Sequence, residues 1–411
     1  THIGAHDGSS LFEQCLDALL EGYAGRAIVA AAGNERIVDP VYTGINTSIE
    51  TAGEAKASNF VIRDNTSHQF FYLDIWGEVN DDFEVGLVMH RGSPGSSVSY
   101  ERSDMLRLGE ALSGDFYGGE IHYQINAHEK LNPSNNKTHI GITLKVPAKI
   151  DPAGLSFDLL VQGTGKIDAW FYPDKPAQTI NFTKLAGDLS HEWSYVAGSV
   201  KSNVSIPSTA KNIISVGGYM ATNNWSSSYD VGELLPFSSV GPALNPHYTG
   251  IKPELVAPGG VIASSKSRAS TLDDEGFDHS FAVGENHTLM AGTSMAAPFV
   301  SGTVALMFSA NSTLTYDNVE RFLIENTYLD NTVGEVPNDS WGYGKLDVIK
   351  SVEAAVAEFG VLGGGSALLN EGDGSSGGCS IGLNKAPLAN VLILFISFAG
   401  LFVRRKFYRQ A

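Results

Sequence analysis

The hydrophobic positions near the start of the chain change from helical to strand-like spacing. Residues 9–23, SSLFEQCLDALLEGY, place apolar residues three and four positions apart, which predicts an amphipathic helix. We expect Ser9 or Ser10 to cap this helix, with Glu13 near the N3 position of a capping box. The next apolar stretch, AIVAAAGNE at residues 27–35, is continuous and ends in small residues. It predicts a buried strand of a parallel sheet that leads into a loop.

One face of the predicted helix carries a cysteine among apolar residues. The residues that share this face are Phe12, Cys15, Leu16 and Leu19, so we expect Cys15 to be a buried core thiol. The second cysteine, Cys379, is either a linker thiol or a point of processing or lipidation. With two cysteines in all, the chain has no disulfide framework.

A long central region alternates apolar and polar residues with period two. Gly, Pro, Asn and Asp separate the alternating stretches, as they separate the strands of an antiparallel β-sandwich. The stretches are NFVIRD, QFFYLDIWGEV, FEVGLVMHR, HYQINAHEK, HIGITLKVP and LSFDLLVQGTGKIDAWFYP. This region therefore predicts an all-β domain.

The C-terminal region has the composition of a membrane anchor. Residues 386–403, APLANVLILFISFAGLFV, carry no charge over 18 residues and are followed by RRKFYR, which fits a membrane span and the positive-inside rule. A buried hydrophobic helix is the alternative interpretation. Residues 361–385 are rich in Gly and Ser and predict a flexible linker. We therefore expect a transmembrane helix and basic tail over residues 386–411, with the folded part outside the cytoplasmic membrane.

Composition limits the class of protein. The 411 residues are 43% hydrophobic and 18% charged, which suits folded domains rather than disorder. The formal net charge is −18 although four basic residues lie in the last eight positions, so we expect no nucleic-acid partner. The chain does not begin with Met and shows no signal peptide. We interpret it either as a mature form or as a chain that begins inside a longer protein.

A Gly-Thr-Ser turn carries the clearest candidate chemistry. The stretch MAGTSMAAPFVSG at residues 290–302 predicts a helix that continues to about residue 310, and Pro298 is tolerated because it lies in the first turn. Ser294 would place its hydroxyl at the positive end of the helix dipole, beside unpaired N–H groups. An isolated serine in this position is most simply an N-cap, so a catalytic role needs support from other stretches.

Five stretches in order resemble the subtilisin-like serine proteases. GTSMAAPFVSGTVALM is similar to the nucleophile motif of this family, and AIVAAAGNE is similar to its oxyanion-asparagine motif. The supporting stretches are PSTAKNIISVGGY (207–219), FSSVGPALNPHYTGIKPELVAPGGVIAS (237–264) and GYGKLDVIKSVEAA (342–355). The resemblance implies a doubly wound, mostly parallel α/β sheet.

The resemblance also implies a domain organisation. Residues 1–35 and 199–360 would form the two parts of the catalytic domain, and residues 36–198 would be an inserted β-sandwich similar to the jelly-roll domains of some bacterial subtilases. The tail resembles bacterial C-terminal sorting signals. Together these predict a bacterial, extracytoplasmic protein that is anchored in the membrane or released after C-terminal processing.

A serine endopeptidase site follows from the same resemblance. Ser294 would be the nucleophile that forms the acyl-enzyme, and Asn34 would donate its side-chain amide to the oxyanion together with the Ser294 N–H. The residues that would bind substrate are Ala31, Ala32, Gly33 and Gly292, and the small side chains would leave room for a large apolar group before the scissile bond. A hydrolase of non-peptide esters is not expected, because the five family-like stretches make it improbable.

The catalytic Asp and His of the family have no matching positions here. THIGAHDGSS at residues 1–10 superficially resembles the end of the family's histidine motif, but only 32 residues separate His2 from Asn34, too few for the strand–helix units that the fold needs between them. GAHDGSS instead resembles the loop before the helix, so His6 and Asp7 are predicted to be structural or cleft-lining. We expect the first half of the sheet and both missing residues upstream, and this chain alone to be inactive. The alternative is an inactive, surface-anchored scaffold whose β-sandwich binds a protein or glycan.

An acidic cluster in the predicted sandwich offers oxygen ligands of the kind that Ca²⁺ prefers. Its members are Asp74, Glu78, Asp81, Asp82 and Glu84, without the spacing of an EF-hand, and solvated carboxylates explain the cluster more simply. We therefore predict no required cofactor, a structural Ca²⁺ with unknown ligands as a further option, and a polypeptide substrate.

Overall fold

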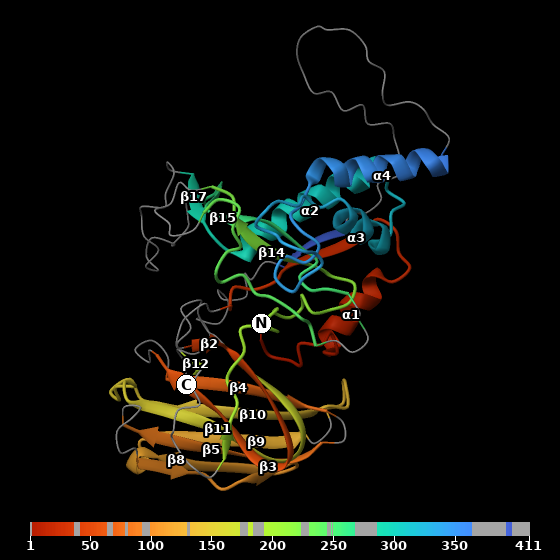
Figure 1. Ribbon diagram of the computed structural model, residues 1–411. Helices are drawn as coiled ribbons and strands as arrows, with labels where there is room; N and C mark the ends of the chain where they lie inside the picture. The colour runs from red at the N-terminus through yellow and green to blue at the C-terminus, as the bar shows by residue number, and fades with distance from the viewer. Residues whose placement is uncertain are drawn as a thin grey trace.

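The structure is a computed structural model, and it forms two units (Figure 1). One unit carries four helices around a small sheet, and the other consists almost wholly of strands. The described residues are 2–36, 42–63, 69–78, 81–92, 99–129, 132–172, 180–183, 193–222, 230–244, 248, 250–267, 286–363 and 392–396. Cys379 and most of the predicted linker and tail lie outside these residues.

A four-stranded parallel sheet forms the centre of the α/β unit. Its order is β15-β14-β1-β18, with β1 (Arg26–Ala31), β14 (Ile214–Met220), β15 (Leu255–Gly260) and β18 (Leu392–Ile396). β1 is the strand predicted from the continuous apolar run, and its residues 27–30 are buried because both faces of the sheet are covered. A separate hairpin of β16 (Ile262–Ser265) and β17 (His287–Met290) follows β15.

Helices pack on both faces of this sheet. They are α1 (Leu11–Leu20), α2 (Thr293–Ala310), α3 (Tyr316–Glu325) and α4 (Val348–Gly363). α2 lies against β1, β14 and β15 and is flanked by α4 (Figure 1). α2 is long and apolar enough to cross a membrane, but its Val300, Val304 and Met307 are core residues of this unit.

The start of α1 confirms the predicted Ser10 cap, but the Glu13 carboxylate bonds to the Ser10 hydroxyl and not to the Ser10 N–H, so the capping box is incomplete. Of the predicted buried face, Leu16 is buried, whereas Cys15 is not. Ser10 is the N-cap, and its hydroxyl accepts a hydrogen bond from the Glu13 N–H and donates one to the Glu13 carboxylate. The buried residues of α1 are Glu13, Leu16 and Leu20. Cys15 is exposed, and Phe12 and Leu19 are about half exposed. The helix is rotated because the Glu13 carboxylate is satisfied in the interior by Ser10 and Thr209.

Twelve strands between residues 42 and 195 form the β-rich unit, all within the range 36–198 expected for the insert. They are β2 (Tyr42–Gly44), β3 (Asn46–Ile62), β4 (Phe70–Gly77), β5 (Asp82–Arg91), β6 (Ser99–Arg102), β7 (Leu106–Arg107), β8 (Ala111–Phe116), β9 (Ile121–Glu129), β10 (Thr138–Lys145), β11 (Leu155–Phe171), β12 (Ile180–Thr183) and β13 (Ser194–Tyr195), with a short 3₁₀ turn at Tyr117–Gly119.

Two long strands, β3 and β11, divide this unit. They pair antiparallel over most of their 17 residues, while the other edge of β11 pairs first with β5 and then with β4. The change of partner falls at Gly163 and Gly165, which have φ of 128° and 140°, and a Cβ at either position would collide with Asp81 or Asp82. Aromatic residues such as Phe60, Phe157 and Phe182 fill the core of the unit.

The C-terminal segment differs from the predicted transmembrane helix where it is described. Residues Leu392–Ile396 form β18, which pairs parallel with β1, from Arg26↔Leu392 to Ala30↔Ile396. The physical reason is that the edge of β1 presents unpaired N–H and C=O groups, and LILFI is rich in strand-forming residues. The rest of residues 386–403 lies outside the described residues.

The N-terminal segment 2–10 lies between the two units. Its Gly4 N–H donates to Asp74 Oδ2 at 2.7 Å, and its His6 ring stacks on Trp170 with ring centroids 4.3 Å apart. Asp7 pairs with Lys137 at 2.9 Å. Hydrogen bonding, stacking and ion pairing through this segment therefore join β4, β11 and Lys137, the residue before β10, to the α/β unit.

Candidate active site

Ser294 lies in the first turn of α2 and is partly exposed. The N-cap of this helix is Gly292, so Ser294 is the second helical residue and does not serve as the cap. The Gly292 N–H donates to the Gly259 carbonyl at 2.8 Å, which fixes the turn to the end of β15. Among the described residues, neither the N–H nor the hydroxyl of Ser294 has a hydrogen-bond partner, so both are available at the positive end of the helix.

Asn34 follows β1 and is tied to the residue before the serine. Its Oδ1 accepts hydrogen bonds from the Thr293 N–H at 2.9 Å and from the Thr293 hydroxyl at 3.1 Å. The Gly33 N–H in turn donates to Thr293 Oγ1 at 3.1 Å. Because Oδ1 holds both Thr293 donors, the Asn34 carboxamide has a defined orientation, and its Nδ2 has no partner among the described residues.

The four residues predicted to bind substrate lie beside Asn34 and Ser294, but they differ in how far they are exposed. Ala32 is fully buried, with its N–H on the Val216 carbonyl, so its side chain faces the interior. Ala31 and Gly33 are partly exposed. A Cβ on Gly292 would lie 3.4 Å from Asn34 Nδ2, so a side chain there would crowd the amide.

Gly33 has no room for a side chain. Its φ is 119°, and an added Cβ would collide with the Glu35 carboxylate and lie 2.7 Å from Ser239 Oγ. Glu35 therefore borders the predicted substrate pocket. Burial alone would raise the pKa of Glu35, but its pairing with His2 at 3.1 Å and its hydrogen bond to Ser239 lower that pKa below the usual value.

A cavity that the sequence did not predict opens beside Ser294. Its volume is about 280 Å³, and its lining combines the β16–β17 hairpin with the first turns of α2: Ile262, Ser264, Ser294, Met295, Pro298 and Phe299. The lining is mostly apolar. In the sequence, only Met295 and Pro298 of the serine motif indicated a wall of this cavity. Ile262 and Ser264 could not be predicted there, because the pairing of β16 with β17 brings them to the cavity.

The two histidines of the N-terminal segment are structural, as predicted for His6. His6 is buried, its Nδ1 lies 2.7 Å from the Val204 carbonyl, and burial is the main cause that lowers its pKa well below 6.5. His2 stacks on His6 and pairs with Glu35. Within the described residues, no histidine is hydrogen-bonded to Ser294.

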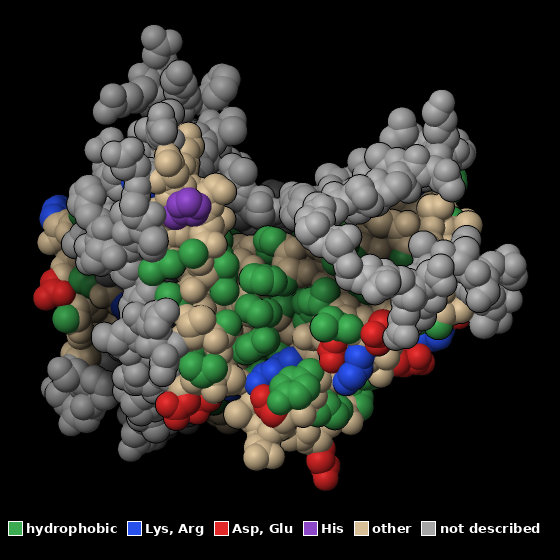
Figure 2. Space-filling view, turned by 90° about the horizontal axis from the view of Figure 1, so that it is seen from above, with side chains coloured by type: hydrophobic (Ala, Val, Ile, Leu, Met, Phe, Trp, Pro, Cys, Tyr) green, Lys and Arg blue, Asp and Glu red, His purple; other side chains and the backbone are tan. Residues whose placement is uncertain are grey.

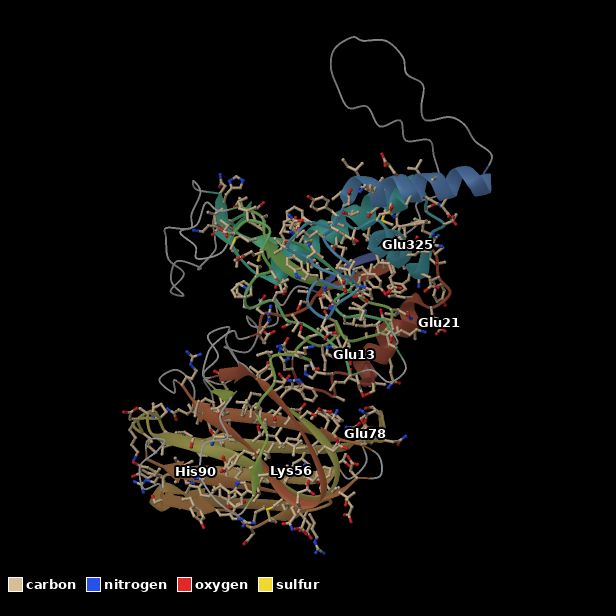
Figure 3. All side chains as sticks on the ribbon, viewed as in Figure 1. Glu13, Glu21, Lys56, Glu78, His90 and Glu325 are labelled. Atoms are coloured by element: carbon tan, nitrogen blue, oxygen red, sulfur yellow. The ribbon has the colours of Figure 1, made fainter. Side chains whose placement is uncertain are left out.

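The acidic cluster of the β-rich unit is dispersed among separate partners. Asp74 is buried and accepts from Trp76 Nε1 at 2.8 Å, Glu78 pairs with Lys137, and Glu84 pairs with Arg107. Figure 3 shows Glu78 and His90 well apart on this unit. The part of the chain that is described contains no group of three or more His, Cys, Asp or Glu side chains placed to hold a metal ion.

The fold and the site define a class of protein: a parallel α/β domain with a serine at the start of a helix and an asparagine amide beside it. Comparison with known proteins specifies the family. The family model described as "Subtilase family" matches residues 186–344. The match confirms the resemblance to the subtilisin-like serine proteases over these residues.

Individual relatives agree. The chain is 34% identical over 156 residues to the serine protease AprX of Bacillus subtilis, which covers 38% of this chain and 33% of AprX. It is 31% identical over 315 residues to the subtilisin-like protease SBT2.3 of Arabidopsis thaliana, 74% of this chain and 33% of that protein. The structure of the CspB protease of Clostridium perfringens shares the fold, with a TM-score of 0.61 and 23% identity over 86% of this chain and 65% of that one. The chain thus spans less than two thirds of each of these proteins.

Proposed function

We propose that this chain is part of a serine endopeptidase that cleaves peptide bonds through an acyl-enzyme on Ser294. The observation that carries the proposal is the contact between Asn34 and Thr293, 259 residues apart, because it brings an amide donor beside the helix-terminal serine that follows Thr293. The match to the subtilase family supports the same activity. The placement of Ser294 in the wall of an open cavity supports access for a polypeptide.

The chemistry follows from the donors that are left unpaired. As Ser294 Oγ attacks the scissile carbonyl, negative charge develops on the carbonyl oxygen, and Asn34 Nδ2 and the Ser294 N–H are the two described groups free to donate to it. The α2 dipole favours the same charge. In subtilisin, removal of one such donor costs about 2.7–4 kcal/mol of transition-state stabilisation.

A general base must accept the Ser294 proton, and we propose that it packs on one exposed stripe of α2. Phe299 and Leu306 are 40% and 53% exposed, and a Cβ added to Gly302 between them would meet no atom within 4 Å. Figure 2, which views the molecule from above, shows hydrophobic side chains gathered near the centre of that face. The stripe runs from the cavity at Ser294, so a helix laid along it would bring a histidine to the nucleophile. The histidine and its aspartate would come from outside the described residues.

We further propose an extracytoplasmic location. Among the relatives are the halolysin-like extracellular serine protease Nep of Natrialba magadii and the minor extracellular protease Vpr of Bacillus subtilis. Anchoring through residues 386–403 is not part of this proposal, because residues 392–396 of that span pair with β1 as β18.

Labelling of the complete protein with a fluorophosphonate probe tests the proposed activity. We expect Ser294→Ala to abolish labelling, and Ser309→Ala to keep it, since Ser309 is an exposed serine of the same helix that bonds only to the Ala305 carbonyl. Labelling that survives Ser294→Ala would assign the nucleophile elsewhere. A complete protein that is not labelled at all would favour the inactive scaffold.

A further inference from the structure

Lys345 is a buried lysine whose ammonium group donates a hydrogen bond with each of its three protons. Lys345 is 2% exposed, and its Nζ donates to the Gly232 carbonyl at 2.8 Å, to Asp330 Oδ2 at 2.6 Å and to Thr332 Oγ1 at 2.9 Å. An ammonium group has three donors, so this set is complete. Burial alone would raise the pKa of Asp330, but its hydrogen bonds to Lys345 and Thr332 lower that pKa to about 2.

Two aromatic rings close the site on the remaining sides. The Lys345 Nζ lies 4.9 Å from the ring centroid of Tyr219 and 5.1 Å from that of Trp341. Both distances are within the range of a cation–π contact, which gains strength when the cation is removed from water. Lys345 therefore occupies a cage of oxygen acceptors and aromatic faces, which is the environment of a bound cation rather than of a surface lysine.

The cage connects the segments that support the nucleophile turn. Tyr219 belongs to β14, and a Cβ added to the preceding Gly218 would be in van der Waals contact with the Thr293 Cα, at 3.7 Å. The residues on either side of Lys345 pair with Val256 of β15, the Val256 N–H with the Gly344 carbonyl and the Leu346 N–H with the Val256 carbonyl. β15 in turn holds the turn at Gly292 through the Gly259 carbonyl.

We infer that Lys345 is a positioning residue whose ammonium group acts as a structural cation tethered to the chain. When the side chain is shortened, the cage binds a free primary ammonium ion in its place. Lys345 touches neither Ser294 nor Asn34 in the described contacts, so its effect on the reaction passes through β14 and β15. The positioning role rests on the proposed function of Ser294, whereas the binding of ammonium in the cage does not.

Chemical rescue of Lys345→Ala in the complete protein tests this inference. The truncation removes three methylenes and the ammonium, which n-propylammonium replaces atom for atom. We expect the Tm to fall by roughly 5 °C and to recover with n-propylammonium, but not with tetramethylammonium, which has the charge without N–H donors. The matched control is Lys350→Ala, which removes an exposed lysine paired with Asp347 and should respond to neither amine. Equal recovery with both amines, or none, overturns the cage as an ammonium site.

The rate of fluorophosphonate labelling separates positioning from simple stability. We expect labelling of Lys345→Ala to be about tenfold to a hundredfold slower, because a displacement of about 1 Å costs up to a hundredfold, and to recover in parallel with the Tm. If n-propylammonium restores the Tm of Lys345→Ala but not its labelling rate, the positioning role of Lys345 is overturned. If the variant does not fold, Lys345→Met keeps the aliphatic stem, and an unchanged labelling rate there overturns the same role. If the unaltered protein is not labelled, the proposed function fails while the Tm still tests the cage.

Discussion

Thr293 shows how a residue outside the proposed reaction can orient the carboxamide of Asn34, the proposed oxyanion donor. It is 1% exposed, and it holds Asn34 Oδ1 with two donors while accepting from the Gly33 N–H. Without the hydroxyl, the Asn34 carboxamide loses one of the two bonds that distinguish its oxygen from its nitrogen.

We therefore predict that Thr293→Val slows fluorophosphonate labelling of the complete protein about tenfold, since loss of a buried hydrogen bond costs on the order of 1–2 kcal/mol. Thr293→Ser keeps the hydroxyl and should label at nearly the original rate. A serine variant as slow as the valine variant would show that the methyl group, rather than the hydrogen bonds, is what matters.

Substitution of Asn34 itself is expected to slow labelling more than substitution of Thr293. Asn34→Ala should slow labelling by about 100–1000-fold, because it removes the proposed oxyanion donor. The Tm should change little, because Asn34 is only partly buried. The measurement is the second-order labelling rate beside a thermal scan of each protein. An unchanged rate would show that Asn34 is not an oxyanion donor.

At the scale of elements, β14 and β15 meet over a buried polar group. Glu254, immediately before β15, is fully buried, accepts from the Ser215 N–H of β14 at 2.8 Å and pairs with Lys252. Tyr248 lies between this carboxyl and Glu320 of α3. Burial raises the pKa of Glu254 to about 7, and Lys252 only partly opposes that shift.

The raised pKa of Glu254 determines whether the free energy of unfolding rises or falls with pH. Between the usual pKa of 4.5 and the folded value of about 7, the folded protein holds a proton on Glu254 that the unfolded chain has lost. The contribution of Glu254 to stability therefore falls as the pH rises through this window and is constant above it. We predict that the free energy of unfolding, taken relative to Glu254→Gln, falls by roughly 2 kcal/mol from pH 5 to pH 8.

The matched control for this pH series is Glu325→Gln, which alters an exposed carboxylate at the end of α3 (Figure 3). Its difference from the unaltered protein should stay nearly constant, because exposed pairs contribute little. Denaturant unfolding at each pH gives both differences. If the free energies of unfolding of Glu254→Gln and of the unaltered protein changed with pH in parallel, Glu254 would not be the source of the pH dependence.

At the scale of the whole molecule, Trp170 connects the two units. It is 1% exposed, stacks on His6 and donates from Nε1 to the Ser202 carbonyl at 3.1 Å. We predict that Trp170→Leu increases trypsin cleavage after the exposed Lys201 about tenfold, because cleavage follows the population of the opened junction. Phe70→Leu, on the outer surface of the β-rich unit, should leave cleavage unchanged. Equal cleavage in both variants would show that the junction does not depend on Trp170.

Local sequence signals predicted the elements that carry the site. The apolar run before Asn34, the Ser10 cap and the turn into α2 depend on neighbours in sequence, so their patterns sufficed. The exposure of Cys15 was not predictable, because the face of α1 is decided by Thr209, 196 residues from Glu13. The cavity beside Ser294 was missed for the same reason, since Ile262 is brought there by pairing with Met290, which lies far along the chain.

The two ends of the β-rich unit lie together, with the Ser199 N–H donating to the Asn46 carbonyl at 2.8 Å. During synthesis Asn34 emerges long before Ser294, and the entropy of bringing them together is lowered only once the unit between them has folded and joined its own ends. The inserted unit therefore adds little to the loop that must close when Asn34 meets Thr293, because its own two ends already lie together.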